Sequence, residues 1–277
     1  MYDLSDKVAV VTGSGRRKGI GEAVALRLAD EGCSVVVSDL GEAKGERFSE
    51  DHVGTSDEME AIAEDVRQRG VRAIAVPCDV RDEADVERLM QRTVDELGRI
   101  DVLVNNAGVG YLMGAVTEVS VEDWDAVLGV NLRGPFLCTK HAARHMTERG
   151  GGGRVINIAS QAAKSGFAFA AAYTASKHGL VGLTRSNAVE LAPHGITVNA
   201  VCPNHVTTGL GDWQNTFFSS AGGQSYDDYL QGIRDRIPLG RVGLVEDIAK
   251  AVAWLASPQA DYVTGEAMNV SGGEEMH

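Results

Sequence analysis

The sequence is poor in the residues that build disulfide frameworks and metal clusters. Its 277 residues include only four cysteines, which lie in apolar segments without Cys-x-x-Cys spacing: Cys33, Cys78, Cys138 and Cys202. Reduced, buried thiols of a cytoplasmic protein are the simplest interpretation of this pattern. His141 and His145 have the spacing of a helical metal-binding pair, but the sequence suggests no third ligand. We therefore expect no metal site, and a helix-surface or subunit-contact role for the two histidines.

Long apolar runs and an excess of positive charge are also missing. No apolar stretch approaches the roughly 20 residues that a membrane-spanning helix needs, and no secretory signal precedes the first strand-like run at residues 7–11. The chain has 26 basic and 39 acidic residues, which give a formal net charge of −13. This charge argues against nucleic acid or an anionic membrane surface as a partner. The expected location is the cytoplasm.

No internal repeat, linker or low-complexity tract divides the chain. Short apolar runs instead alternate with helical stretches, at residues 7–11, 34–38, 72–76, 100–104, 155–158 and 196–201. This alternation is typical of α/β proteins with a parallel sheet covered on both faces. The four glycines at 150–153 indicate a helix stop before a strand, not a domain boundary. We therefore predict one domain over residues 1–277, a doubly wound parallel sheet of about seven strands with helices on both faces.

The first strand-like run leads into a glycine-rich loop and then into an amphipathic helical stretch. The loop reads Thr12-Gly13-Ser14-Gly15-Arg16-Arg17-Lys18-Gly19-Ile20-Gly21. Glycines let backbone N–H groups approach a pyrophosphate, and the start of a helix favours negative charge. Asp39 ends the second strand-like run about 20 residues further on, where an acidic side chain can bond adenosine ribose hydroxyls. Together these features predict a dinucleotide-binding (Rossmann) fold.

Tyr173 and Lys177 are four residues apart and share one face of a predicted helix. A phenol normally holds its proton to about pH 10, and a neighbouring ammonium is expected to lower that pKa. Ser160 follows the apolar run at 155–159 and can present a hydroxyl beside the phenol. The three residues predict a site that moves a proton on and off a carbonyl or alcohol oxygen.

These motifs resemble those of the short-chain dehydrogenase/reductase superfamily, in its single-domain branch. The resemblance covers nearly the whole chain and rests on the glycine loop, Cys78-Asp79-Val80, Asn105-Asn106-Ala107-Gly108, Val130-Asn131-Leu132-Arg133-Gly134, Ser160, Tyr173-x-x-x-Lys177 and Thr264 to Gly273. It implies hydride transfer between a nicotinamide cofactor and an alcohol or ketone. Because the substrates of this superfamily vary widely, the resemblance does not identify the substrate.

The resemblance implies a catalytic set of Asn131, Ser160, Tyr173 and Lys177. Tyr173 would exchange a proton with the substrate oxygen, and Ser160 would polarise that oxygen. Lys177 would lower the phenol pKa and bond the nicotinamide ribose, while Asn131 would hold a water that links Lys177 to solvent. The implied cofactor-binding set is larger: Gly13, Gly15, Gly19, Ile20, Gly21, Asp39, Leu40, Asp79, Val80, Asn105, Asn106, Ala107, Gly108, Tyr173, Lys177, Pro203, Val206 and Thr208.

Two features of the N-terminal region favour different cofactors. Arg16, Arg17 and Lys18 lie in a loop about two residues longer than the family pattern, and such basic residues often accompany NADP. Asp39 would instead bond the free 2′-hydroxyl of NAD and repel a 2′-phosphate. Repulsion in a partly buried pocket should outweigh attraction by solvated basic side chains. NAD is therefore favoured over NADP.

Two further departures from the family pattern leave alternatives open. An insertion near residues 41–57 is acidic and punctuated by glycine, and it is either a solvated loop or a flap near the adenosine end of the site. Pro203-Asn204 stands where the family usually has Pro-Gly. Asparagine tolerates a left-handed backbone, so the turn can survive. Asn204 and His205 would then either bond a polar substrate or serve only the turn.

A substrate lid is predicted near residues 207–236, with ordinary helix packing as the alternative. This segment carries an aromatic set: Trp213, Phe217, Phe218, Tyr226 and Tyr229. The residues predicted to contact the substrate are Ser160, Gln161, Tyr173, Asn204, His205 and Trp213, and further lining residues are predicted after the strand ends at Tyr111, Met113, Lys164 and Phe167. This mixture favours a small polar secondary alcohol or its ketone, such as a polyol, sugar or diol.

Two rival functions remain open at this stage. The nearer one is a 3-oxoacyl thioester reductase that uses NADPH, which Asp39 and the long lid disfavour. The other is a catalytically silent dinucleotide-binding sensor, which the complete catalytic set disfavours. Assembly as a homotetramer is a further implication of the resemblance.

Overall fold

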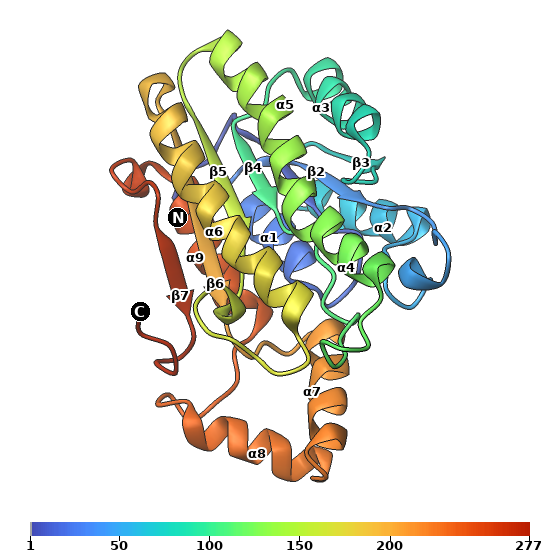
Figure 1. Ribbon diagram of the computed structural model, residues 1–277. Coiled ribbons are helices and arrows are strands. Elements are labelled where there is room, and N and C mark those ends of the chain that lie inside the picture. Colours follow the sequence, from blue (N-terminus) through green and yellow to red (C-terminus); the bar gives the residue numbers. More distant parts are fainter. Residues whose placement is uncertain (1) are drawn as a thin grey trace.

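The computed structural model describes residues 2–277, and one parallel seven-stranded sheet forms their centre (Figure 1). The strand order is β3-β2-β1-β4-β5-β6-β7. The strands are β1 (Val8–Thr12), β2 (Ser34–Asp39), β3 (Ala73–Pro77), β4 (Val102–Asn105), β5 (Gly153–Ile158), β6 (Ile196–Pro203) and β7 (Ala267–Val270). The chain winds outward from β1 in both directions, so the order reverses between β1 and β4. Ligands of such sheets bind at this switch point, beyond the carboxyl ends of the strands.

The strands are apolar throughout because helices cover both faces of the sheet. β1 illustrates the pattern: all five residues are buried, and successive side chains point to opposite faces. Ala9 and Val11 belong to one buried cluster, and Val8 and Val10 belong to the other. The sheet therefore separates two hydrophobic cores.

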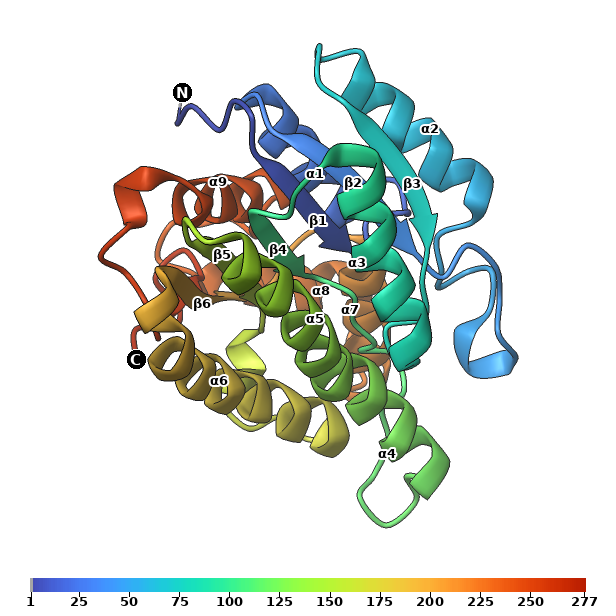
Figure 2. The same cartoon turned by 90° about the horizontal axis from the view of Figure 1, so that it is seen from above.

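The helices divide between the two faces as the buried clusters require (Figure 2). One face carries α1 (Ile20–Asp30), α2 (Ser56–Arg67) and α9 (Val245–Ala256), and the other carries α3 (Glu83–Leu97), α4 (Val121–Leu128), α5 (Gly134–Arg149) and α6 (Ala171–Leu191). Several of these helices begin with side-chain caps. The Asp82 carboxylate accepts hydrogen bonds from the backbone of Ala84 and Asp85, and the Ser120 hydroxyl accepts one from Asp123.

Two helices belong to neither layer. α7 (Gly209–Ala221) and α8 (Tyr226–Arg236) lie beyond the carboxyl end of β6, at the lower edge of the molecule in Figure 1. Four short 3-10 turns complete the regular structure: Glu46–Phe48, Gln161–Ala163, Ala192–His194 and Pro258–Ala260. A π-helical turn at Gly129–Arg133 joins α4 to α5.

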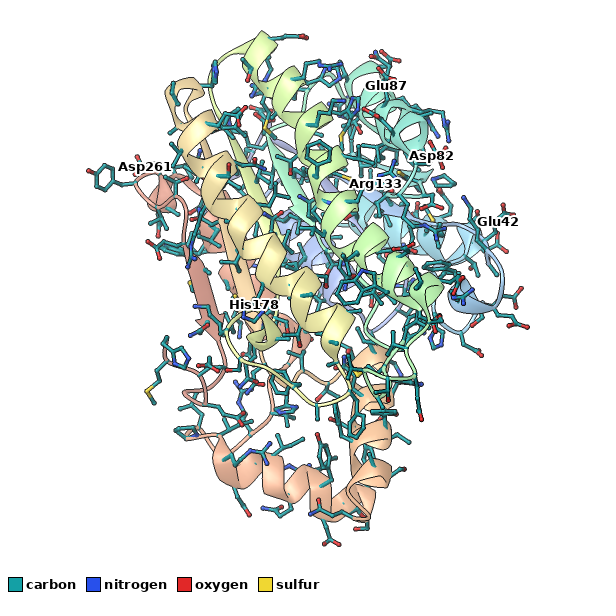
Figure 3. All side chains as sticks on the ribbon, in the orientation of Figure 1. Glu42, Asp82, Glu87, Arg133, His178 and Asp261 are labelled. Carbon is teal, nitrogen blue, oxygen red and sulfur yellow. The ribbon has the colours of Figure 1, made fainter. Side chains whose placement is uncertain are left out.

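The predicted fold class is confirmed, since the structure has seven parallel strands with helices on both faces. Acidic side chains such as Glu42, Asp82, Glu87 and Asp261 are spread around the periphery (Figure 3). Within residues 2–277, no helix has the length and apolar character needed to cross a membrane, and no group of three or more metal-ligating side chains is found. The four cysteines are buried and unpaired.

Candidate active site

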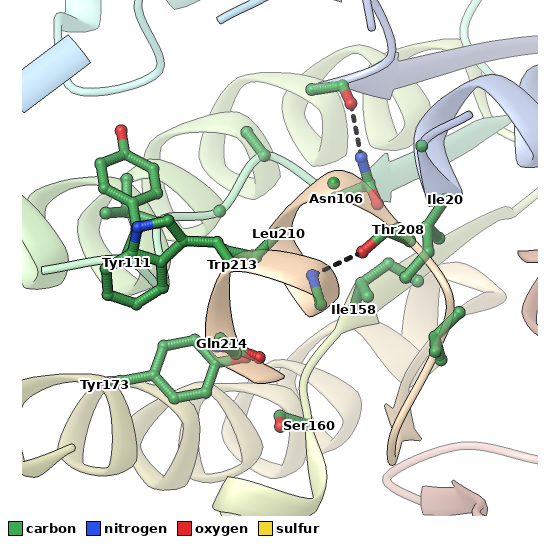
Figure 4. Close-up of a pocket in the computed structure, with 18 of the residues that line it drawn as sticks. Ile20, Asn106, Tyr111, Ile158, Ser160, Tyr173, Thr208, Leu210, Trp213 and Gln214 are labelled. Carbon is green, nitrogen blue, oxygen red and sulfur yellow. Dashed lines mark hydrogen bonds between the residues drawn. The ribbon is translucent and has the colours of Figure 1, made fainter. Parts of the chain in front are cut away.

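A cavity of about 440 Å³ lies at the carboxyl edge of the sheet, at the switch point between β1 and β4. Its walls come from the glycine loop after β1, the segments after β4, β5 and β6, and the two outlying helices α7 and α8. Figure 4 shows Ile20 and Asn106 on one side of this cavity and Ser160 and Tyr173 on another. The cavity therefore joins the predicted cofactor residues to the predicted catalytic residues.

The glycine loop has the geometry of a pyrophosphate cradle. Gly13 has φ +64°, and a Cβ there would lie 2.5 Å from the Ala107 Cα atom. No side chain caps the start of α1 at Gly19, and Ile20 and Gly21 line the cavity. The N–H groups at an uncapped helix start would suit a bound phosphate. The residues present therefore fit a dinucleotide.

Asp39 lines the cavity at the end of β2, and its carboxylate is held by three backbone N–H groups. Gly15 donates at 3.0 Å, Gly54 at 3.1 Å and Leu40 at 2.9 Å. Burial raises the pKa of Asp39, and the three backbone hydrogen bonds oppose that shift. The neighbouring residue Ser38 also lines the cavity, but its hydroxyl oxygen is buried and has no hydrogen-bond partner among the described residues. A ribose hydroxyl could donate a hydrogen bond to the Asp39 carboxylate.

The predicted adenine-binding residue Asp79 is already paired with cations. Arg81 donates to its carboxylate at 2.8 and 2.7 Å, and the Lys44 ammonium lies 3.4 Å away. Burial alone would raise the pKa of Asp79, but the hydrogen bonds and charge of Arg81 lower it below the usual range. The Arg81 guanidinium lies 4.0 Å from the centroid of the Phe48 ring. This stack places the insertion directly against the adenine side of the cavity.

We call residues 41–57 the strap, because this insertion crosses the adenosine side of the cavity. Phe48 and Val53 are buried, and a Cβ on Gly54 would lie 2.5 Å from the Gly15 carbonyl carbon. The acidic side chains Glu42 and Glu46 are exposed. The acidic outer part of the strap is thus exposed, and Phe48 and Val53 of its inner part line the cavity.

A chain of aromatic side chains connects the strap to α7. The rings of His52 and Tyr111 stack at 3.8 Å between centroids, and the Tyr111 hydroxyl donates to the Arg47 carbonyl at 2.8 Å. Tyr111 meets Trp213 edge to face at 6.4 Å, and Trp213 stacks on Phe217 at 5.4 Å. The strap and α7 are thus in contact through Tyr111, which lies beside Trp213 in Figure 4.

Ser160 and Tyr173 lie together on the wall opposite the glycine loop. Ser160 follows β5, and its Oγ accepts a hydrogen bond from the Ala162 backbone at 3.1 Å. Tyr173 is half-buried in the first turn of α6 and lines the cavity. Burial raises the pKa of Tyr173, and a hydrogen bond with the Ser160 hydroxyl opposes this shift. The two hydroxyl groups can therefore meet one substrate oxygen.

Lys177 does not have the predicted effect on the phenol in this structure. Its ammonium lies 5.6 Å from the centroid of the Tyr173 ring and donates to the Ile158 carbonyl at 2.8 Å. Burial lowers the pKa of Lys177 to about 8. The pKa of Tyr173 is raised, not lowered, because burial of the phenol outweighs the attraction of a cation directed at a carbonyl.

Asn131 is fully buried in the π-helical turn, and its side chain does not reach the cavity. Its Oδ1 accepts from the Val109 backbone at 2.7 Å, and its Nδ2 donates to the Val109 carbonyl at 2.8 Å and to Ser176 Oγ at 3.1 Å. The side chain thus ties the loop after β4 to α6. The water-holding role of Asn131 stays a prediction.

The substrate end of the cavity is less polar than the sequence suggested. Gln161, Asn204 and His205 line it as predicted, but the two amides donate to acidic residues of the C-terminus. Thr208 Oγ1 accepts from the Gly211 backbone at 2.9 Å and so caps α7 (Figure 4). Burial lowers the pKa of His205, so its imidazole is neutral at pH 7.

Most of the predicted site residues line this one cavity. The exceptions are Gly15, packed under Asp39; Asn105, whose amide bonds Asn157 at 2.8 Å; Asn131; and Lys164, whose ammonium bonds the Ala267 carbonyl at 3.0 Å. Six further lining residues were not named individually from the sequence: Phe48, His52, Val53, Arg81, Gln214 and Arg236. Five of them lie in the predicted insertion or lid, and Arg81 directly follows Asp79-Val80.

Arg17, one of the basic loop residues that favoured NADP, also lines the cavity, but its side chain is already paired with acids. Its guanidinium is paired with Glu22 at 2.7 Å and with Asp65, and its backbone N–H donates to Glu58 at 2.8 Å. These partners leave Arg16 as the loop arginine beside Asp39. Its positive charge opposes the rise in the Asp39 pKa that burial causes.

Comparison with known proteins agrees with this geometry. The sequence profile of the enoyl-(acyl carrier protein) reductase family matches residues 13–275. A short-chain dehydrogenase/reductase of Armillaria gallica is 40% identical over 96% of this chain and 95% of its own. Carveol dehydrogenase of Mycobacterium avium, solved with NAD, has a TM-score of 0.91 and 30% identity over 99% of both chains. Actinorhodin polyketide ketoreductase, solved with NADPH, has a TM-score of 0.86 and 39% identity over 98% of both chains.

These matches cover almost the full length of the chain and of each relative, and the fold, the glycine loop and the Tyr173–Lys177 pair accompany them. The chain belongs to the short-chain dehydrogenase/reductase superfamily of oxidoreductases.

Proposed function

We propose that this protein is an NAD-dependent oxidoreductase that interconverts a secondary alcohol and its ketone. The observation that carries the proposal is the convergence of Ser160, Tyr173 and Lys177 on one cavity with the glycine loop and Asp39. A proton-transfer group and a dinucleotide cradle in one cavity are what hydride exchange with a carbinol carbon requires.

The glycine loop and Asp39 would hold a nicotinamide dinucleotide, which would supply the hydride chemistry when bound. Tyr173 exchanges a proton with the substrate oxygen through its hydroxyl, and the Ser160 hydroxyl polarises that oxygen. The raised pKa of Tyr173 keeps the phenol protonated at neutral pH, ready to act as an acid toward a ketone. Alcohol oxidation needs the phenolate, and the Lys177 ammonium would stabilise it after leaving the Ile158 carbonyl. Fixed positions of these groups would supply much of the rate.

The geometry around Asp39 supports NAD over NADP. Three backbone N–H groups hold its carboxylate in place, and one of them, from Gly54, belongs to the strap. Because the carboxylate is fixed, it could not move away from the 2′-phosphate of NADP. The two negative charges would repel each other strongly in a partly buried pocket. Arg16 lies on the same wall of the cavity, and its positive charge would instead favour NADP by attracting the 2′-phosphate. Relatives solved with NAD and with NADPH exist, so cofactor choice depends on these local groups.

The substrate end supports an alcohol whose body is apolar. Aromatic and aliphatic side chains of the predicted lid and of neighbouring loops line it: Met113, Phe167, Leu210, Trp213 and Phe218. The polyol, sugar or diol interpretation depended on Gln161, Asn204 and His205. The side-chain amides of Gln161 and Asn204 each donate a hydrogen bond to a glutamate near the C-terminus. Polar alcohols are therefore the second substrate class that we propose, with His205 as their remaining side-chain partner.

A 3-oxoacyl thioester reductase that uses NADPH is the second candidate function. The matching family profile and the similarity to a polyketide ketoreductase favour it. The fixed carboxylate of Asp39 argues against it. A catalytically silent sensor is the least supported alternative, since such a protein would not need Ser160, Tyr173 and Lys177 around one cavity.

A substrate and cofactor screen tests the proposal. The purified protein is assayed by nicotinamide absorbance with NAD and NADP in parallel, against aromatic and alicyclic secondary alcohols, polyols, sugars and 3-oxoacyl thioesters. We expect turnover of a cyclic or aryl secondary alcohol with NAD. Activity confined to acyl thioesters with NADPH would establish the second candidate instead, and cofactor binding without any turnover would support the sensor.

Assembly as a homotetramer is also proposed, from the resemblance to the superfamily. Apolar side chains of α4 and α5 support it, since Phe136 is 48% exposed and Trp124 is 37% exposed. Light scattering after size-exclusion chromatography gives the mass directly, and a monomer at micromolar concentration would overturn it.

A further inference from the structure

Two consecutive carboxylates near the C-terminus bind three side chains of the cavity wall. Glu274 accepts hydrogen bonds from the Asn204 amide and from Arg236 Nε, the latter at 3.1 Å. Glu275 Oε2 accepts from Gln161 Nε2 at 3.3 Å. Gln161, Asn204 and Arg236 all line the cavity, and they come from three separate elements: the turn after β5, the end of β6 and the end of α8.

We call residues 271–277 the tail, and its own contacts hold these carboxylates in place. The Ser271 hydroxyl donates to the Glu275 carbonyl at 3.0 Å and accepts from the Glu275 backbone at 3.2 Å. The Gly272 carbonyl accepts from the Leu239 backbone at 3.1 Å, and Gly272 has φ +64°, where a Cβ would lie 2.7 Å from Ile237. The tail therefore packs against the segment that follows α8.

Glu275 is the more deeply placed of the two acids, with 7% of its surface exposed. The Ser165 hydroxyl donates to its Oε2 at 2.9 Å, beside the Gln161 amide. These two hydrogen bonds, with Ser165 the stronger influence, hold the pKa of Glu275 below its usual range. Glu275 is therefore ionised at neutral pH and bonds both donors as a carboxylate.

The contacts have two consequences for a bound substrate. The amide donors of Gln161 and Asn204 point at the tail, so a polar substrate that needs them would have to break charge-assisted hydrogen bonds. The Arg236 charge is compensated by Glu274 at the far end of the proposed lid. Both sets of contacts make the substrate end of the cavity less polar. The ion pair of Arg236 with Glu274 also links the end of α8 to the body of the protein.

We propose that Glu274 and Glu275 are positioning residues that set substrate selectivity, by withdrawing Gln161, Asn204 and Arg236 from the substrate and by holding α8 over the cavity. This inference rests on the proposed oxidoreductase function and extends it. It assigns to the tail a preference for secondary alcohols with an apolar body over polyols.

Steady-state kinetics of Glu274→Ala and Glu274→Gln test the proposal, with Glu266→Ala as the matched control because Glu266 is an exposed acid of the same region. For Glu274→Ala we expect KM for the preferred apolar alcohol to rise about 5-fold, which corresponds to about 1 kcal/mol. We expect kcat to stay within about two-fold, since Tyr173, Ser160 and Lys177 are untouched. The kcat/KM ratio of a polyol to the apolar alcohol should rise about 10-fold, because the Asn204 amide is released. Glu274→Gln keeps an acceptor for Asn204 and should recover most of the selectivity.

Hydrogen exchange of the same variants gives a readout that needs no turnover. The proposal predicts faster exchange in residues 226–237 of Glu274→Ala and unchanged exchange in β4, β5 and α6, while Glu266→Ala matches the wild type everywhere. If the wild type oxidises no secondary alcohol, the proposed function fails, and the exchange result still tests the link between the tail and α8. Unchanged selectivity and unchanged exchange in Glu274→Ala would overturn the proposal, as would a general loss of kcat or of folding that Glu274→Gln does not rescue.

Discussion

The two ends of the cavity are built by different means. At the cofactor end, the glycine loop, Asp39 and the start of α1 lie within about 30 residues of sequence and are set by the consecutive elements β1, α1 and β2. At the substrate end, the wall combines side chains from the ends of β5 and β6, from α7 and α8, and from the tail at residues 271–277. Local backbone geometry dominates the first end, and long-range side-chain contacts dominate the second.

The difference shows what each end contributes. Backbone N–H groups and a fixed carboxylate suit an invariant ligand such as a dinucleotide, because they leave little freedom to adapt. Side chains on outlying helices can change without disturbing the sheet, so they suit a substrate that differs between relatives. Tyr173 and Ser160 lie between the two ends, where the two ligands would meet.

The largest expected effect tests whether the cofactor end and the substrate end of the cavity serve one reaction. Tyr173→Phe removes the hydroxyl that exchanges the proton, and we expect kcat to fall by about 10³-fold, within the range of general acid–base catalysis. Affinity for NAD, measured by calorimetry, should change little, since the phenol is expected to act on the substrate. A variant that retains more than about a tenth of the wild-type kcat would show that another group transfers the proton.

Lys177 connects the two ends, and its burial predicts a pH-dependent stability. Burial lowers the pKa of Lys177 to about 8 in the folded protein, against an ordinary value of 10.5. Between these values the unfolded chain binds more protons, so this group makes the free energy of unfolding rise with pH. Relative to Lys177→Met, the wild type should gain up to about 3 kcal/mol between pH 7.5 and pH 10.5. Urea unfolding of both proteins across this range measures the gain, and a constant difference would contradict the lowered pKa.

The cofactor end is tested by Asp39→Asn. Asparagine keeps a carbonyl oxygen for the Gly15 or Gly54 backbone but removes the negative charge. We expect the NAD to NADP ratio of kcat/KM to fall about 30-fold, equivalent to about 2 kcal/mol. Arg16→Ala is the control of opposite sign and should make NADP still poorer. If the wild type already uses NADP better than NAD, the assignment of Asp39 is wrong.

The smallest expected effect concerns the contact between the strap and α7. Tyr111→Leu removes the stack on His52 and the hydrogen bond to Arg47, and Tyr111→Phe removes only the hydrogen bond. Aromatic pairs contribute about 1 kcal/mol, so Tyr111→Leu should weaken NAD binding and raise substrate KM by about 5-fold each. Tyr111→Phe should lie nearer the wild type. Equal effects of the two variants would assign the coupling to the hydrogen bond instead of the stack.

The residues predicted for the cofactor end could be named from the sequence because their signals are local. A glycine with positive φ, an uncapped helix start and an acid after the second strand follow from residues close in the chain, and the structure brings Gly13, Ile20 and Asp39 to one cavity. Helical spacing places Lys177 near Tyr173 but does not reveal the Ile158 carbonyl that accepts its hydrogen bond, and the role of Lys177 toward the phenol stays a prediction. Nor does the sequence reveal that the Gln161 and Asn204 amides donate to Glu275 and Glu274, which are 114 and 70 residues away.

The sequence by itself determined the class of fold and the superfamily and predicted the residues that would exchange a proton, because periodicity and motif spacing act over short stretches of chain. Only the tertiary structure decided which polar side chains face the cavity and which are already bonded. Those outcomes depend on contacts such as Gly54 with Asp39, Tyr111 with Arg47 and Glu274 with Asn204, whose partners are brought together by the packing of the whole sheet.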